Sequence, residues 1–312
     1  MPRRIIIDTD PGLDDAVAIL LALAAADQLE VLGVVAVAGN LSLAVTERNA
    51  RRVCALAGRP EIPVHAGCAR PLMRPLVTAE RIHNDPRLDA VLPEPAAPLQ
   101  PQHGVDFLIE TLRGAEAGEI TLCALGPLTN IAMALVKAPD IAGKIGELVI
   151  MGGAGFELGN VTPAAEFNIH VDPHAAAIVL DSGVPITMIP LDVTHQLLNT
   201  PPRLAALRGL GNRCGPAVAV MLTVFDENRL ARFGTRARAL HDPAVVAFLL
   251  HPALFEGREV NVAIETQSPL TMGMTVVDWW GVTGRKLNVR WMNIVDAGGF
   301  YDLLVEKLAR LP

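Results

Sequence analysis

The start of the chain constrains the fold more than any other stretch. Three isoleucines at positions 5–7 run directly into a group of four aspartates, which are Asp8, Asp10, Asp14 and Asp15. The Pro-Gly pair at 11–12 predicts a sharp turn. Residues 16–23 are apolar and good helix formers. The sequence therefore predicts a buried strand, a tight turn, and a helix whose first turn is acidic.

Four carboxylates this close in the chain repel one another unless a cation lies between them. Oxygen ligands on a turn suit a hard ion such as Ca²⁺ or Mg²⁺. Capping of the following helix is the simpler explanation for Asp14 and Asp15. It does not explain Asp8 and Asp10, which end the strand, so we expect a metal or catalytic site here.

Composition limits the remaining possibilities. The chain has 312 residues, of which 51% are hydrophobic and 19% are charged, enough to bury a large core. Its net charge of −7 argues against nucleic acid as a partner, and the apolar run at 17–26 is about half of a membrane span. The first four residues lead straight into the strand, so we expect no secretory signal and a cytoplasmic protein. The four cysteines are far apart and read as buried free thiols.

Strand-like and helix-like segments alternate along the chain. Strands are expected at residues 31–38, 62–67, 119–125, 147–151 and 185–192, with three more in the tail at 260–265, 274–280 and 287–295. Helical segments lie between them, and the proline-rich stretch 71–101 reads as a functional loop or flap. This alternation predicts one α/β domain over residues 1–312, with an open, mostly parallel, Rossmann-like sheet and helices on both faces.

Ligands of such sheets bind outside the carboxyl ends of the strands. The polar segments after successive strands should therefore meet in one crevice. Further along, Asn160, Glu166 and Asn168 offer two amides and a carboxylate, a set suited to a polyol such as a sugar. An extended stretch at 166–169 would turn Glu166 and Asn168 to the same side. A solvated loop is the alternative.

Two histidines are candidates for proton transfer. His241 directly precedes Asp242 at the start of a helix and could donate a proton near neutral pH. A simple N-cap is the alternative for Asp242. His83 lies in the long loop, where a surface histidine is the alternative.

Several motifs together resemble the nucleoside hydrolases, the inosine-uridine-preferring family of N-ribohydrolases. The first is Asp8-Thr9-Asp10-Pro11-Gly12-Leu13-Asp14-Asp15-Ala16. In the same order follow Gly39-Asn40, Leu125-Gly126-Pro127-Leu128-Thr129-Asn130, Met151-Gly152-Gly153, Gly159-Asn160, Ala165-Glu166-Phe167-Asn168 and His241-Asp242-Pro243. The tail Val277-Asp278-Trp279-Trp280 is similar to the pyrimidine-preferring bacterial branch.

The resemblance implies a Ca²⁺ ion held by Asp10, Asp15, Asp242 and the backbone carbonyl of Leu125. It implies that Asp10 deprotonates the attacking water. The ribose would be bound by Asp14, Asn160, Glu166 and Asn168, with Asn40 nearby. His241 would face the leaving base, and His83 would lie on the loop above it.

The expected reaction is hydrolysis of the N-glycosidic bond of ribonucleosides to ribose and free base. This sequence departs from the family pattern in two places. The flap has His83-Asn84-Asp85-Pro86 where the family often has His-Gly. The segment before His241 has no tyrosine where the family usually has aromatic or amide side chains; it carries Phe233 and four arginines, which are Arg229, Arg232, Arg236 and Arg238. A homo-dimer or homo-tetramer is expected by resemblance alone. Two alternatives remain: a nucleoside- or ribose-binding member without turnover, and a phosphatase with Asp8 as nucleophile.

Overall fold

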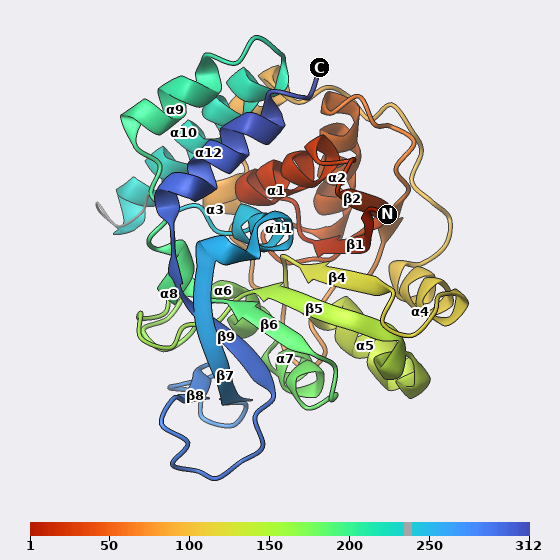
Figure 1. Ribbon diagram of the computed structural model, residues 1–312, viewed down its shortest axis with the longest axis vertical. Coiled ribbons are helices and arrows are strands. Elements are labelled where there is room, and N and C mark those ends of the chain that lie inside the picture. Colours follow the sequence, from red (N-terminus) through yellow and green to blue (C-terminus); the bar gives the residue numbers. More distant parts are fainter. Residues whose placement is uncertain (234–238) are drawn as a thin grey trace.

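A nine-stranded sheet runs through the centre of the protein, with helices on both faces (Figure 1). The computed structural model describes the backbone of residues 1–233 and 239–312, and the side chains of these except at 231–233. The strands are β1 Arg3–Thr9, β2 Leu29–Ala36, β3 Val64–Ala66, β4 Ile120–Ala124, β5 Ile145–Met151, β6 Ile186–Ile189, β7 Phe255–Ile264, β8 Thr275–Asp278 and β9 Val289–Val295.

The strands lie in the order β3-β2-β1-β4-β5-β6-β9-β7-β8. Every pair from β3 to β9 is parallel, whereas β7 pairs antiparallel with both β9 and β8. The prediction of an open, mostly parallel α/β sheet is confirmed. β1 lies between β2 and β4, so the turn that follows it opens at the middle of the parallel part.

The helices are α1 Leu13–Ala24, α2 Leu43–Leu56, α3 Glu80–His83, α4 Gly104–Gly114, α5 Thr129–Lys137, α6 Phe167–Val171, α7 Pro173–Leu180, α8 Leu191–Thr194, α9 Pro201–Arg208, α10 Cys214–Phe233, α11 Pro243–Leu250 and α12 Ala297–Leu308. Short 3₁₀ segments lie at Pro86–Ala90, Pro139–Lys144 and Pro252–Leu254. Among the described helices, none is both long and apolar enough to cross a bilayer.

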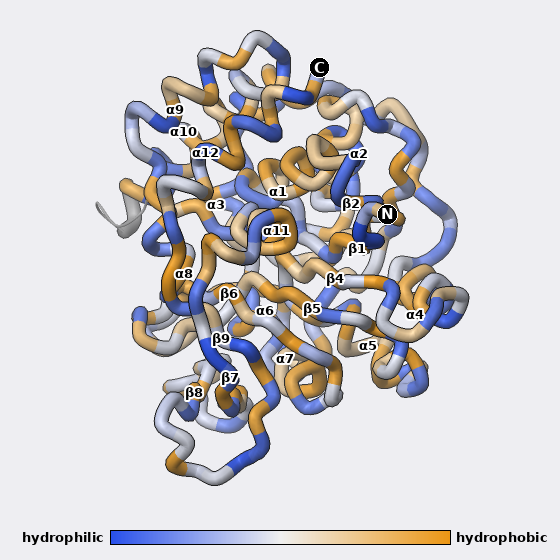
Figure 2. The backbone as a smooth tube through the Cα atoms, viewed as in Figure 1, coloured by the Kyte–Doolittle hydropathy of each residue, from blue (hydrophilic) through white to orange (hydrophobic). Residues whose placement is uncertain are grey.

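The isoleucines of β1 divide between two hydrophobic cores, because neighbouring side chains of a strand face opposite ways. Ile5 and Ile7 belong to the core shared with α1, α2, α10, α11 and α12, whereas Ile6 belongs to the core shared with α4, α5 and α7. Every residue of α1 is buried. It contacts α2, α10, α11 and α12, and the mainly apolar colouring of α1 and α11 is visible in Figure 2. Such burial fixes the acidic end of α1 in place.

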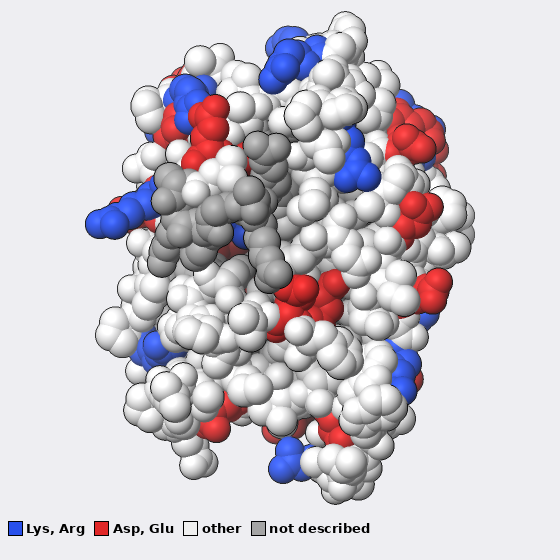
Figure 3. All heavy atoms as spheres, turned by 90° about the vertical axis from the view of Figure 1, so that its left-hand side faces the viewer, with Lys and Arg blue, Asp and Glu red and all other residues white. Residues whose placement is uncertain are grey.

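The arrowheads of β4, β5 and β6 point to the left in Figure 1, toward the face turned to the viewer in Figure 3. Over the coloured and white part of that face, the basic side chains are scattered and form no continuous patch.

Two segments differ from the sequence-based expectation. The stretch 71–101 is mostly loop, as predicted, but contains α3 and a 3₁₀ segment. The prediction of an extended stretch at 166–169 is wrong, because Phe167–Val171 forms the one-turn helix α6. Glu166 caps that helix by accepting hydrogen bonds from the backbone of Asn168 and Ile169, and this local cap outcompetes the extended form.

Candidate active site

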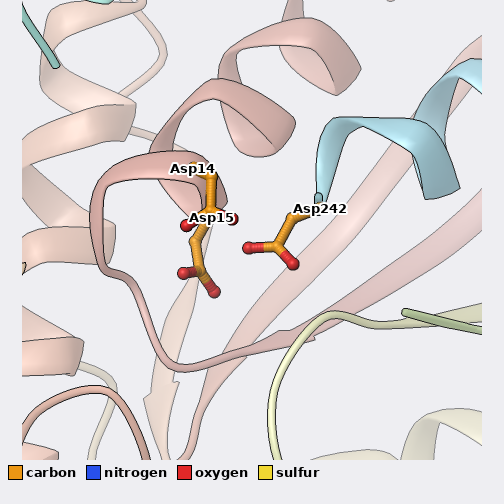
Figure 4. A group of neighbouring side chains, drawn as sticks. All are labelled: Asp14, Asp15 and Asp242. Carbon is orange, nitrogen blue, oxygen red and sulfur yellow. The ribbon is translucent and has the colours of Figure 1, made fainter. Parts of the chain in front are cut away.

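Carboxylates from two distant parts of the chain meet at the carboxyl end of the sheet (Figure 4). Asp14 and Asp15 form the first turn of α1, and Asp242 directly precedes α11. One carboxylate oxygen of each lies within 4.8 Å of the others, and all three residues are buried. Asp242 occupies the N-cap position of α11, yet its side chain makes no capping hydrogen bond. Helix capping therefore does not explain this carboxylate.

Asp10, which follows β1, and Asp15 are fully buried. Asp15 accepts hydrogen bonds from the Thr9 hydroxyl at 2.5 Å and from the backbone N–H of Gly12 at 3.0 Å. Asp10 Oδ2 accepts from the backbone N–H of Asn40 at 2.6 Å, while its Oδ1 is buried without a hydrogen-bond partner. A Cβ at Gly126 would lie 2.5 Å from that Oδ1, so glycine is required where the chain passes this carboxylate.

Burial raises the pKa of three carboxyls at this site, those of Asp10, Asp14 and Asp242. It raises the pKa of Asp14 to about 7, with the charge of Asp15 adding to the shift. The pKa of Asp10 is raised well above its usual range by burial and by Asp15, and that of Asp242 by burial and by Asp14. Such shifts mean that the ionised group costs free energy unless a cation offsets it.

Amide and carboxylate side chains from α6 and from the loop before it line the same pocket. Asn168 Nδ2 donates to the backbone carbonyl of Leu125 at 2.7 Å and to that of Met151 at 3.2 Å. Glu166 also accepts from the backbone N–H of Gly153 at 3.1 Å, and burial raises its pKa to about 7. Asn160 Oδ1 accepts from the backbone N–H of Phe167 at 2.9 Å, which fixes the loop before α6.

His241 is buried and held from both sides. Its Nε2 lies 2.7 Å from Arg229 Nη1, and its Nδ1 lies 2.8 Å from Thr194 Oγ1. Because a guanidinium only donates hydrogen bonds, Nε2 must be the acceptor and the ring proton lies on Nδ1. Burial and the charge of Arg229 lower the pKa of His241 well below its ordinary value. The imidazole is therefore neutral in this arrangement.

His83 is also buried, which excludes the alternative of a surface histidine. Its Nδ1 accepts a hydrogen bond from the backbone N–H of Leu13 at 3.1 Å. The ring lies so close to Gly12 that a Cβ there would overlap it. Burial and Arg229 lower the pKa of His83 to about 3. The flap thus rests on the N-terminus of α1 through a neutral imidazole.

The structure brings the residues predicted from the sequence to one place. One pocket is lined by nine of them, which are Asp14, Asn40, His83, Leu125, Asn160, Glu166, Asn168, His241 and Asp242. Asp10 and Asp15 do not line it directly. They lie beneath Asn40, whose Nδ2 donates to Asp15 Oδ2 at 3.1 Å.

Other lining residues were given no role by the sequence. Phe225 and Arg229 of α10 line the pocket, as do Val77, Thr78 and Ala79 of the flap. Phe225 and Arg229 are four residues apart, the spacing that puts two side chains on one face of a helix. This spacing could have predicted from the sequence that the two side chains face the same side of the helix. Of the other arginines in this segment, Arg236 and Arg238 lie outside the described residues, as do the side chains of Arg232 and Phe233.

Comparisons with known proteins agree with this geometry. A family model described as inosine-uridine preferring nucleoside hydrolase matches residues 5–302. A pyrimidine-specific ribonucleoside hydrolase, RihA, of Salmonella paratyphi B is 45% identical over 99% of each chain. An uncharacterized protein of Schizosaccharomyces pombe is 52% identical over 99% of this chain and all of its own length. The solved structure of a purine-preferring ribonucleoside hydrolase from Gardnerella vaginalis has a TM-score of 0.90 at 31% identity, covering 98% of each chain.

Proposed function

Since this chain belongs to the inosine-uridine preferring nucleoside hydrolase family, we propose that it is a Ca²⁺-dependent hydrolase that cleaves ribonucleosides to ribose and free base. The chain is an N-ribosyl hydrolase by its relatives. The metal, the roles of individual residues and the preferred base are our proposal. The family resemblance noted in the sequence motifs is confirmed.

One observation carries the proposal. Three buried carboxylates from α1 and from the start of α11 lie within 4.8 Å of one another, in a pocket whose walls carry the amides and the carboxylate suited to a sugar. The two halves of this set are separated by more than two hundred residues in the chain. Their meeting is difficult to explain by stability, because buried like charges are unfavourable.

The residues fit a hard cation. Asp10 has a buried oxygen without a partner, Asp14, Asp15 and Asp242 present further oxygens, and Leu125 lines the same pocket. An all-oxygen set of this charge suits Ca²⁺. We propose Asp10, Asp15, Asp242 and Leu125 as its ligands. The ion would lower the pKa of a water bound there.

The protein side chains divide the remaining work. Asp10 takes the proton of the attacking water. Asp14, Asn160, Glu166 and Asn168, with Asn40 beside them, hold the ribose hydroxyls. N-glycosidic cleavage builds positive charge on the ribose, and the carboxylates around it stabilise that charge electrostatically. His241 and His83 lie on the side of the leaving base. A role of His241 as an acid requires Arg229 to leave its Nε2, and that role stays a prediction.

The two alternatives fare differently. Asp8 is 1% exposed and accepts a hydrogen bond from Asn130 Nδ2 at 2.8 Å. A phosphoester has no access to it, so we set the phosphatase aside. A nucleoside-binding protein without turnover would use the same pocket, and it differs from a hydrolase only in that it releases no ribose.

Incubation of the purified protein with Ca²⁺ and, separately, uridine, cytidine, inosine and adenosine tests the proposal. Released ribose is measured by a reducing-sugar assay, and binding of each nucleoside is measured by calorimetry. Ribose release that needs Ca²⁺ supports the proposal. Binding without release establishes the nucleoside-binding alternative, and the relative turnover of the four substrates gives the base preference.

Two further expectations remain predictions. A homo-dimer or homo-tetramer is checked by light scattering of the purified protein. The cytoplasmic location is checked by cell fractionation.

A further inference from the structure

Arg229 is a buried cation in the wall of the pocket. It lies near the end of α10 and is 6% exposed. Its Nη1 donates to the backbone carbonyl of Ala239 at 3.1 Å and to His241 Nε2 at 2.7 Å. The guanidinium carbon lies 4.9 Å from the centre of the Phe225 ring. These contacts fix one end of the guanidinium and leave its plane against an aromatic face.

The group keeps its charge in this environment. Burial lowers the pKa of Arg229, whereas the charges of Asp14 and Asp226 oppose that shift. A guanidinium remains protonated in proteins because its pKa exceeds about 12. The same positive charge lowers the pKa of both His83 and His241. Arg229 is thus the permanent cation of this side of the pocket.

Among the described residues, the guanidinium of Arg229 has donors that are not used. Of its five N–H groups, the two on Nη1 serve Ala239 and His241. Within the described side chains, no hydrogen-bond partner is found for Nε or Nη2. His241, by contrast, offers an acceptor to Arg229 and its proton to Thr194. The donor ready to meet a leaving base in this corner is therefore the arginine.

Resting on the function proposed above, we propose that Arg229 binds a carbonyl oxygen of the leaving base and stabilises the negative charge that the base acquires in the transition state. The C1′–N bond breaks, and its electron pair passes to the base and is shared by the ring nitrogen and carbonyl oxygens. The water oxygen bonds to C1′ and its proton passes to Asp10. The released base takes a proton from solvent.

This arrangement favours one class of base. A guanidinium donates only, so it pairs with a carbonyl oxygen and not with an amino group. Pyrimidine bases carry a carbonyl beside the glycosidic nitrogen, whereas adenine has none. A fixed positive charge also opposes any route in which the base is protonated before it leaves. We therefore expect uridine to be cleaved faster than adenosine, and Arg229 to be a reason for it.

The test compares two substrates that differ in how well the base leaves as an anion. Fluorine at position 5 makes uracil more acidic, so 5-fluorouridine needs less help than uridine. The variants are Arg229→Gln, which removes the charge, and Arg229→Lys, which keeps it. Arg203→Gln is the control, because that guanidinium lies over Tyr301 at 4.1 Å and donates to the Leu198 carbonyl outside the pocket.

Loss of a charge-stabilising donor typically costs about 10²–10³-fold in kcat, so we expect a loss of about that size for Arg229→Gln on uridine. On 5-fluorouridine the loss should be about tenfold smaller, since a better leaving group depends less on the cation. Arg229→Lys should lose less on uridine, and Arg203→Gln should behave as the wild type on both substrates. The lysine variant also supplies the comparison if the glutamine variant does not fold.

An equal loss on both substrates, or no loss, overturns the role of Arg229 while leaving the proposed function intact. Absence of ribose release by the wild type from every nucleoside overturns the proposed function, and this inference with it.

Discussion

The substitution Asp10→Asn separates the chemical role of this residue from its structural one. Asn has the same shape, so the acceptor for the Asn40 backbone N–H, now at 2.6 Å, can be retained. What is lost is the negative charge, which also helps to hold the proposed ion, and the oxygen that can take a proton from water. In the structure this oxygen is buried and has no hydrogen-bond partner.

The expected effect follows from the contribution of a positioned base. General-base catalysis is worth about 10²–10⁴-fold, so kcat should fall by that factor, equivalent to about 3–5 kcal/mol in the barrier. Stability should move in the opposite direction in metal-free protein. Burial and the Asp15 charge make the ionised Asp10 unfavourable there, so removing its charge relieves repulsion and should raise the Tm.

The assay is ribose release from saturating uridine with excess Ca²⁺, accompanied by thermal unfolding in EDTA. Asp8→Asn is the matched control. Asp8 lies two residues earlier, is equally buried, and also has one oxygen without a partner, but it accepts from Asn130 Nδ2 and is not among the proposed ligands of the ion. We expect this control to keep kcat within about tenfold of the wild type, as suits a group that does not take part in proton transfer.

A kcat for Asp10→Asn within a few-fold of the wild type would refute the assignment of Asp10 as the base. An equal loss in Asp8→Asn would mean that any change at the end of β1 disturbs the site, and the argument from proton transfer would fail.

Three further outcomes are expected. Dialysis against EDTA should abolish ribose release, and retained activity in EDTA would contradict the metal site. The loss of the ion should lower the Tm more at pH 8 than at pH 5. The reason is that buried carboxyls with a raised pKa destabilise the metal-free fold as the pH rises through that pKa and they ionise. In denaturant titrations, Asp8→Asn should gain stability relative to the wild type as the pH rises from 4 to 8, since burial raises the pKa of Asp8 from 3.8 to about 7. Each pKa unit is worth about 1.4 kcal/mol, which gives an upper bound of about 4 kcal/mol for the gain. A pH-independent difference in stability would refute this. Glu166→Gln keeps an acceptor for the α6 cap but loses the charged partner of a ribose hydroxyl. The value of kcat/KM for uridine should therefore fall about ten- to hundredfold at little cost in Tm. Glu166→Ala also removes the cap and should lose about 1 kcal/mol of stability as well.

The sequence by itself determined the fold class and named nine of the residues that line the pocket. The alternation of apolar strands with helices predicted the parallel sheet, because each period reports which face of an element is buried. The segments after successive strands, which include Asp10, Asn40 and Leu125, were expected to meet because the carboxyl ends of parallel strands share one edge. Asp242 was added to them only by the resemblance to the family.

Only the tertiary structure decided the local geometry and the state of the charged groups. The run after Ala165 forms a capped helical turn in place of an extended segment, because Glu166 finds backbone donors that no pattern reveals. His83 is buried against Gly12. Burial, and then the charge of Arg229 on α10, lower the pKa of both His83 and His241. Burial and charge depend on contacts between segments far apart in the chain. The acidic start of α1 is therefore predictable from the sequence, whereas the position of Arg229 beside His241 in the pocket wall is visible only in the fold.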